Sequence, residues 1–377
     1  MTFRRYRAVA RKEFLHILRD WRSLFAALAM PVVLLLLFGY ALTLDVDRIA
    51  TYVYDQDGSP ESRELVERFQ GSRYFDILGM AGDYGTIERG IDTSRILLGV
   101  VISHDFSKNL LAGKEANVQL LLDGSDSNTA SLALGYAEGL MQMYALEVQN
   151  RAQDRKGIGR IGPAVDARIR VWYNSELQSK NYIVPGLIAV ILMIIAALLT
   201  SLTIAREWEN GTMEQLLSTP LRPAELLLGK LSAFFVLGLV DTVIAIFVGV
   251  VVFEVPLRGN PLFLLAASSI FLFGALCWGI LISTVARSQL MAYQIGILSS
   301  FLPAFLLSGF VYAIENMPPV IRLLTYIIPA RYFVTILKGI FLKGAGPEIL
   351  WGPLALLCVY AAVVFFLATK RLRQKVA

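Results

Sequence analysis

The sequence predicts an α-helical integral membrane protein with six transmembrane helices and an inserted α/β domain outside the membrane. Of its 377 residues, 56% are hydrophobic and only 17% are charged, which is too apolar for a soluble chain of this length. Long apolar runs recur along the chain, and each meets the requirement of about 20 residues for crossing a bilayer. These runs lie at 23–44, 181–205, 231–253, 259–286, 288–314 and 349–369.

The distribution of basic residues predicts the orientation in the membrane. The connections at 1–22, 206–230, 287 and 370–377 hold fifteen Lys and Arg residues, whereas the short connections on the other side hold five. Residues 45–180 are left out of this comparison, because long loops translocate largely regardless of charge. Because short cytoplasmic loops are enriched in Lys and Arg, both termini are expected in the cytoplasm. The net charge of +5 suits a membrane surface and gives no reason to expect nucleic acid.

Residues 1–22 predict an amphipathic helix lying in the inner interface of the membrane. Apolar side chains recur there at spacings of three and four, while the basic residues lie elsewhere around the helix. The apolar positions are Phe3, Tyr6, Ala10, Phe14, Ile17 and Trp21. A plain cytoplasmic extension is the alternative interpretation.

Residues 45–180 predict a small α/β domain, because short β-rich runs alternate with helical ones. The predicted strands are Ile49–Tyr54, Leu97–Ser103, Val118–Asp123 and Ala167–Tyr173. The predicted helices are Glu61–Gln70, Asp105–Ala112 and Ser127–Arg155. Residues Arg155–Pro163, with three glycines, are expected to form a mobile loop. The domain lies on the periplasmic side if both termini are cytoplasmic.

Residues 206–220 form the most polar island between two long apolar runs. Gly211 is expected to end one helix, and Thr212 with Gln215 is a capping-box pattern for a new one. Pro220 and Pro223 then end the short helix and start the next. In the short helix, one apolar face is expected to fit a groove on a partner, and it consists of Met213, Leu216 and Leu217. A polar loop without a helix is the alternative.

Residues 315–348 are too apolar for a solvated loop and too broken for a seventh span. Pro318–Pro319 and Pro329 are each expected to start a helical segment. We therefore expect a re-entrant hairpin in the outer leaflet, where protein covers the turn. A hairpin lying on the membrane surface is the alternative.

The sequence gives no support for an enzyme. Leu228-Gly229-Lys230 lacks the upstream glycine and the following Ser or Thr of a nucleotide-binding P-loop. The two histidines, His16 and His104, are expected on opposite sides of the membrane, so no His-based metal site or nucleophile–histidine pair is predicted. The chain is expected to hold no cofactor of its own.

Several stretches resemble one known family. The run REWENGTMEQLLSTP, residues 206–220, resembles the cytoplasmic signature of ABC-2 type permeases, the membrane subunits of ATP-binding-cassette exporters of the type V fold. Further similarity lies in the stretches beginning at Phe38 (FGY), Asp123 (DGSDSNTA), Leu307 (LSGF), Met317 (MPPVIR) and Ile328 (IPARYF). The large external domain is similar to that of the bacterial multidrug-efflux branch.

This resemblance implies a dimer of permeases in a bacterial inner membrane, each seated on a separate ATPase subunit that binds ATP and Mg²⁺. The second permease is either another copy or a related sibling. The resemblance assigns coupling to the ATPase to Arg206, Glu207, Trp208, Glu209, Gly211, Thr212, Met213, Glu214, Leu216 and Leu217. It also implies that the hairpin closes the outer side, through Pro318, Pro319, Pro329 and Arg331.

The predicted function is export of a hydrophobic or amphipathic compound, drug-like or lipid. Aromatic and Met residues of the first, second and fifth spans are candidates to line its path, with simple packing as the alternative: Phe38, Tyr40, Met193, Phe301, Phe305 and Phe310. Asp241 interrupts the third run near mid-bilayer and is expected to be a hydrogen-bonding group at a helix contact. The rival hypotheses are a proton-coupled secondary efflux transporter that uses Asp241 and a membrane-anchored receptor.

Overall fold

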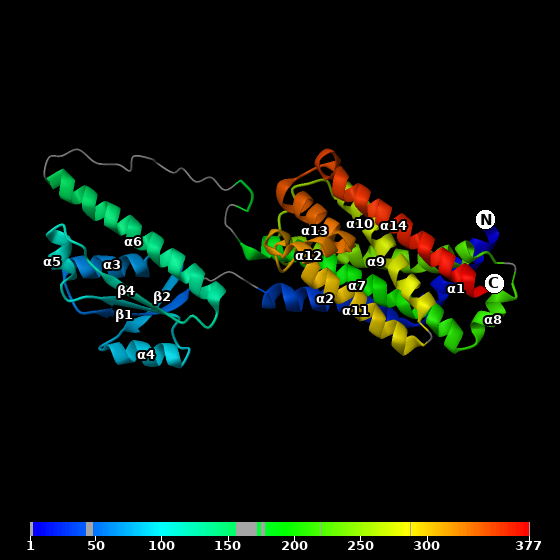
Figure 1. The fold of residues 1–377 in the computed structure, drawn as a ribbon, viewed down its shortest axis with the longest axis horizontal. Helices are drawn as coiled ribbons and strands as arrows, with labels where there is room; N and C mark the ends of the chain where they lie inside the picture. The colour runs from blue at the N-terminus through cyan, green and yellow to red at the C-terminus, as the bar shows by residue number, and fades with distance from the viewer. Residues whose placement is uncertain are drawn as a thin grey trace. The chain divides into compact units, whose positions relative to one another are not determined.

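The computed structural model describes residues 3–42, 48–155, 172–174, 178–219, 221–286 and 288–376. Contacts between residues divide the chain into two compact units (Figure 1). The first, called the helical unit below, combines Met1–Thr43 with Arg170–Ala377. The second, the α/β unit, comprises the intervening residues Leu44–Ile169. The α/β unit is therefore inserted into the sequence of the helical unit.

The described part of the helical unit is built from helices around a central one. In chain order these are α1 (Phe3–Arg19), α2 (Trp21–Ala41), α7 (Ser179–Glu209), α8 (Thr212–Leu217), α9 (Pro223–Val251), α10 (Pro261–Val285), α11 (Gln289–Leu307), α12 (Pro319–Leu324), α13 (Pro329–Lys338) and α14 (Pro347–Val376). Helix α7 packs against α2, α9, α10, α11 and α13, and most of its residues are buried. The ends of the chain, α1 and α8 lie at one end of this unit, called the α8 end (Figure 1).

Five described helices are long and apolar enough to cross a membrane, namely α7, α9, α10, α11 and α14. They occupy the last five predicted runs, and their prediction as long apolar helices is confirmed. Helix α2 occupies the first predicted run, but its apolar section, Ala27–Ala41, is shorter. A sixth span at 23–44 stays a prediction.

The segment after α11 bends sharply. Helices α12 and α13 begin at Pro319 and Pro329, as the prolines predict, and the axes on either side of Ile328 meet at 86°. Arg331 stabilises the bend, because its guanidinium lies 3.8 Å from the centre of the Tyr326 ring and donates a hydrogen bond to Thr325. This geometry fits either a broken span or the predicted re-entrant hairpin.

The α/β unit contains one four-stranded sheet in the order β2-β1-β3-β4. The strands are β1 (Ile49–Asp55), β2 (Phe75–Met80), β3 (Leu98–Ile102) and β4 (Val118–Leu122), and the helices are α3 (Pro60–Gln70), α4 (Tyr84–Asp92), α5 (Phe106–Leu111) and α6 (Ser127–Arg155). Strand β1 is parallel to β2 and β3, whereas β4 is antiparallel to β3. Three of the predicted strands and all three predicted helices are present, but β2 and α4 were not predicted.

Helices cover both faces of this sheet (Figure 1). On one face Val53 and Val100 pack with Phe69 of α3 and residues of α6. On the opposite face Val101 packs with Ile87 of α4. The predicted strand at 167–173 and the predicted loop at 155–163 lie almost entirely outside the described residues, and Trp172 and Tyr173 are not in a strand.

Candidate functional site

The polar island between the second and third long apolar runs folds as a short helix at the α8 end. Helix α7 ends at Glu209, and α8 follows after Asn210 and Gly211. Gly211 has a φ of 70°, in the left-handed region where a glycine meets no steric penalty. The turn predicted at Gly211 and the start of α9 predicted at Pro223 are confirmed. Pro220 lies outside the described residues.

The predicted capping box of α8 is wrong. Gly211, not Thr212, is the N-cap residue, and α8 has no side-chain cap. Thr212 is the first helical residue, and its hydroxyl donates to the carboxylate of Glu207. In a capping box this hydroxyl would accept from the backbone N–H of Gln215, but that pairing requires Thr212 to be the N-cap residue. Here the hydroxyl instead donates to Glu207 and joins α8 to α7.

The apolar face of α8 points into its own chain. Met213 is completely buried in the core of the helical unit, and Leu216 is half-buried against the same core. The expectation that Met213 fits a groove on a partner is therefore wrong, because the core of this chain already covers it. The side chain of Leu217 is not among those described. Glu214 and Gln215 are exposed and form the outward face.

The last turn of α7 is tied to the start of α11. Glu209 accepts a hydrogen bond from the backbone N–H of Gln289 at 2.9 Å. A carboxylate at this position is favoured, since Gln289 is the first residue of α11 and helix N-termini attract negative charge. Arg206 donates from Nε to Oε1 of Gln289 at 3.4 Å. Trp208 is partly buried and packs against the core of the helical unit.

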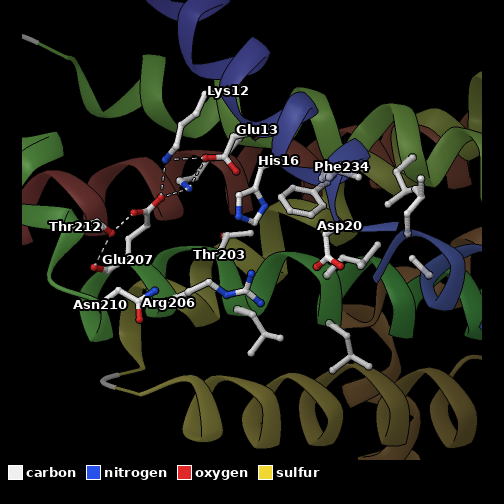
Figure 2. Close-up of a pocket in the computed structure, with 18 of the residues that line it drawn as sticks. Lys12, Glu13, His16, Asp20, Thr203, Arg206, Glu207, Asn210, Thr212 and Phe234 are labelled. Atoms are coloured by element: carbon white, nitrogen blue, oxygen red, sulfur yellow. Dashed lines mark hydrogen bonds and ion pairs between the residues drawn. The ribbon is translucent and has the colours of Figure 1, made fainter. Parts of the chain in front are cut away.

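A buried cluster of charges lies behind α8, called the Lys230 cluster below. The ammonium of Lys230 lies 2.8 Å from Oε1 of Glu13 and 3.0 Å from Oε1 of Glu207, and its side chain is only 2% exposed. Lys12 adds a second cation 3.1 Å from the same Glu207 oxygen. Since Glu207 also accepts from Thr212, the cluster joins α1, α7, α8 and α9 (Figure 2).

These contacts also set the charge state of the more accessible lysine. Burial alone lowers the pKa of the Lys12 ammonium, but its hydrogen bond to Glu207 and the charges of Glu207 and Glu13 raise it above its ordinary value. Lys12 therefore stays cationic, as the charge balance of two lysines and two glutamates requires.

Helix α1 reaches the Lys230 cluster because α9 has no side chain at Gly229. A Cβ at this position would lie 2.7 Å from Cβ of Val9, closer than real side chains approach. The close contact places Val9 and Glu13 of α1 in the interior of the unit. The sequence analysis missed Glu13 and Lys230 as site residues. A lone lysine within the apolar start of α9 was the available signal, because such a residue needs a buried partner.

A cavity of about 440 Å³ lies beside the Lys230 cluster (Figure 2). Its polar lining includes Lys12, Glu13, His16, Asp20, Arg206 and Glu207. Its apolar lining includes Leu24, Leu198, Leu199, Leu202, Phe234 and Leu237. The cavity therefore has two chemically different sides, contributed mainly by α1, α2, α7 and α9.

Asp241 does not have the environment that was predicted for it. It is only 1% exposed, and neither carboxyl oxygen has a hydrogen-bond partner within the described residues. The neighbouring Thr242 hydroxyl donates instead to the carbonyl of Gly238 at 2.7 Å. The prediction of a hydrogen-bonding group is therefore wrong for the described part of the chain, because the local hydroxyl already has a backbone acceptor.

The residues proposed to line a substrate path lie elsewhere than the cavity. Met193 and Phe310 are buried in the core of the helical unit, so the prediction that they line an open cleft is wrong for this conformation. Phe38, Phe301 and Phe305 are partly buried against the same core. Tyr40 is exposed, and its ring centre lies 5.0 Å from that of Phe253. None of the six lines the cavity of Figure 2.

Known proteins resemble the chain over its whole length. Residues 21–370 match the family described as "ABC-2 family transporter protein". The probable multidrug ABC transporter permease YbhS of Escherichia coli (strain K12) is 38% identical over 376 residues, which is 100% of this chain and 98% of YbhS. The probable multidrug ABC transporter permease YbhR of the same strain is 34% identical over 376 residues, 99% of this chain and 100% of YbhR. The inner membrane transport permease YhhJ, also of strain K12, is 27% identical over 330 residues, 86% of this chain and 85% of YhhJ. Since the family match covers most of the residues from α2 to α14, the chain belongs to the ABC-2 family of transporter proteins.

Proposed function

We propose that this chain is the membrane-spanning permease subunit of an ATP-binding-cassette exporter. It moves a hydrophobic or amphipathic compound out of the cytoplasm or the inner leaflet, while a separate subunit binds and hydrolyses ATP. The names of the relatives, multidrug and inner membrane transport permeases, support this proposal. The absence of a P-loop in the sequence is the reason for placing ATP hydrolysis on the partner.

The observation that carries the proposal is the construction of α8. This six-residue helix has a core-packed inner face, a link to the Lys230 cluster, and an outward face of exposed polar residues. A helix fixed from behind transmits displacement to α7 and α9 better than a flexible loop. We infer that α8 is the coupling helix and that its outward face, rather than its apolar face, contacts the ATPase.

Reversing charge on that face tests the inference. Glu214→Lys/Gln215→Lys changes the charge of the outward face, and the variant is expected to fold because both side chains are exposed. Recovery of the ATPase subunit in gentle-detergent purification is expected to fall about tenfold or more, because the altered charge disfavours the contact. The matched control is Glu138→Lys/Gln142→Lys on exposed positions of α6. Normal recovery of the ATPase with the α8 variant, together with normal ATP hydrolysis, contradicts the coupling role.

The proposal places the chain in a bacterial inner membrane as one of two permeases. The excess of Lys and Arg in one set of loops supports cytoplasmic termini. Exposed apolar side chains on α2 and α11, such as Leu37 and Leu298, support a contact through these helices with another copy or a sibling permease. Cysteine pairs placed in 25–37 and 294–306 are expected to crosslink between chains, and crosslinks confined to single chains contradict this contact.

A second candidate function has one observation in its favour. The buried carboxyl of Asp241 has no hydrogen-bond partner in the described structure, which suits a group that binds and releases a proton. Transport into inside-out membrane vesicles, measured once with ATP alone and once with a proton gradient alone, distinguishes the two functions. The exporter proposal expects ATP to be essential and Asp241→Asn to retain most transport. Transport driven by the gradient alone, and lost in Asp241→Asn, favours the proton-coupled transporter.

A further inference from the structure

The cavity beside the Lys230 cluster has the size and the two-sided lining of a small-molecule site. Its volume of about 440 Å³ lies within the range of roughly 300–1,000 Å³ usual for ligand pockets. Leucines from α2 and α7 and Phe234 of α9 form the apolar side. An occupant that fills both sides is amphipathic, with its apolar part along these side chains.

The charges of the cavity decide which kind of head group it accepts. Glu13 and Glu207 are both held by Lys230, and Lys12 also contacts both, so these four charges compensate one another. Asp20 has an interaction of its own. The carboxylates of Glu13 and Glu207 are therefore not available to a cationic ligand without disrupting ion pairs within the protein.

Arg206 also lines the cavity, and its charge is not used by the ion pairs of the Lys230 cluster. Within the described residues it is in no ion pair, and its recorded side-chain hydrogen bond uses Nε and a neutral amide, Gln289. Figure 2 shows its side chain extending into the cavity below His16. The two terminal nitrogens of a guanidinium form a fork that matches the oxygens of a phosphate, sulfonate or carboxylate. His16 adds an imidazole that donates from a ring N–H.

We propose that this cavity binds an anionic amphiphile, whose acidic head group contacts Arg206 and His16 and whose apolar part lies against Leu202 and Phe234. We further infer that this occupant is cargo of the exporter, and only this last step rests on the proposed function. Glu207 and Thr212 line the same cavity, so an occupant touches the wall that holds α8. Occupancy is thereby connected to the helix that we assign to the ATPase contact.

Photolabelling of the purified full-length chain tests the site without the ATPase or ATP. The chain is placed in phosphatidylcholine nanodiscs and titrated with two probes that share one diazirine-bearing dodecyl chain, one with a phosphate head and one with a trimethylammonium head. The phosphate probe is expected to label peptides of α1, α2, α7 and α9 with saturation. Its affinity is expected to fall about tenfold or more in Arg206→Gln, since a charge-assisted bidentate contact is lost.

Four further variants separate recognition of the ligand from structural damage. Gln289→Ala removes the hydrogen-bond partner of Arg206 but keeps the guanidinium, and it is expected to retain affinity. Arg371→Gln makes the same charge change at an exposed position of α14 outside the cavity and is expected to have no effect. Leu202→Asn is expected to weaken labelling by both probes, because it removes an apolar contact to the dodecyl chain that they share. Leu356→Asn, at an exposed position of α14, is expected to have no effect.

The outcomes distinguish this inference from the proposed function. Equal affinity for both head groups, labelling confined to helices other than α1, α2, α7 and α9, or unchanged affinity in Arg206→Gln overturns the site even if ATP-driven export is observed. Saturable labelling that depends on Arg206 supports the site even if no ATP-driven export is found. In nanodiscs that contain phosphatidylglycerol, competition identifies a membrane lipid as the occupant, and no competition identifies a free amphiphile.

Discussion

The ammonium of Lys230 in α9 lies 3.0 Å from the carboxylate of Glu207 near the end of α7. Both residues belong to the Lys230 cluster, which holds α8 through Thr212. Removing Lys230 takes the buried cation from Glu13 and Glu207 and leaves them only Lys12, whose side chain is 53% exposed. Breaking a buried ion pair in this way costs about 3–5 kcal/mol. Lys230→Met is therefore expected to unfold at a markedly lower temperature, and Lys230→Arg is expected to restore part of the loss.

The matched control for this prediction is an exposed ion pair. Lys180 lies 3.5 Å from Glu254, whose side chain is 79% exposed. Such pairs contribute about 0–1 kcal/mol, so Lys180→Met is expected to change the unfolding temperature little. Equal effects of the two substitutions in thermal unfolding of the purified protein contradict the structural role of the Lys230 cluster.

The hydroxyl of Thr212 is the direct link between α8 and this cluster. Thr212→Val removes the link and leaves the ion pairs of Lys230 in place. ATP hydrolysis by the complex is expected to continue, but the amount of compound exported per ATP is expected to fall several-fold. Thr212→Ser keeps the hydroxyl and is expected to behave as the wild type. Identical export per ATP in the Val and Ser variants argues against the link.

The left-handed conformation of Gly211 predicts a stability difference between two glycines. A side chain at a positive φ costs about 1–2 kcal/mol, so Gly211→Ala is expected to destabilise the protein. Gly352 lies inside α14 with open space around it, and Gly352→Ala is expected to stabilise the helix by up to about 1 kcal/mol. Denaturant unfolding measures both changes, and a shift of the same sign for both contradicts the backbone explanation.

The α/β unit is expected to lose stability in acid through Glu64. A hydrogen bond from Arg151 lowers the pKa of Glu64 below its ordinary value of 4.5, with further help from the charges of Arg151 and Arg68, although burial opposes the shift. A carboxyl with a depressed folded pKa stabilises the fold above its unfolded pKa, and this stability is lost as the pH falls through the folded value.

Hydrogen exchange of peptides from α3 and α6 in the full chain measures this loss. Protection in the wild type is expected to decline as the pH falls below about 4.5. Arg151→Met removes the cation that lowers the pKa of Glu64, and its protection is expected to depend less on pH in this range. Parallel pH profiles for the two proteins show that another group controls the acid response.

The long apolar helices were predictable because their signal lies in consecutive residues. Gly211 and the prolines that start α9, α12 and α13 were predictable for the same reason, since each acts on its own backbone. Strand β2 was missed because Phe75–Met80 contains both Asp76 and Gly79, two residue types depleted in strands, and α4 was missed because Gly85 and Gly90 interrupt its pattern.

The candidate site was less predictable because its chemistry depends on distant residues. Glu13 and Lys230 are separated by 217 positions, and nothing near either residue indicates the other. Thr212 matches a capping pattern, but Glu207 of the preceding helix takes its hydroxyl. Met213 belongs to an apolar stripe that was expected to face a partner. It is buried instead, because α8 folds back against the core of its own chain, and the local sequence does not indicate this.

The close packing of α1 on α9, where Val9 contacts Gly229, affects the order of folding during synthesis. The ribosome completes α1 before the residues that receive it exist. At roughly 5–20 residues per second, the separation of Glu13 from Lys230 corresponds to a delay of about 10–40 seconds. During that time Glu13 has no lysine from α9 to pair with. Closure of the N-terminal helix is therefore a late step of biogenesis, and a bulky fusion placed directly before Phe3 is expected to slow assembly more than the same fusion after α14.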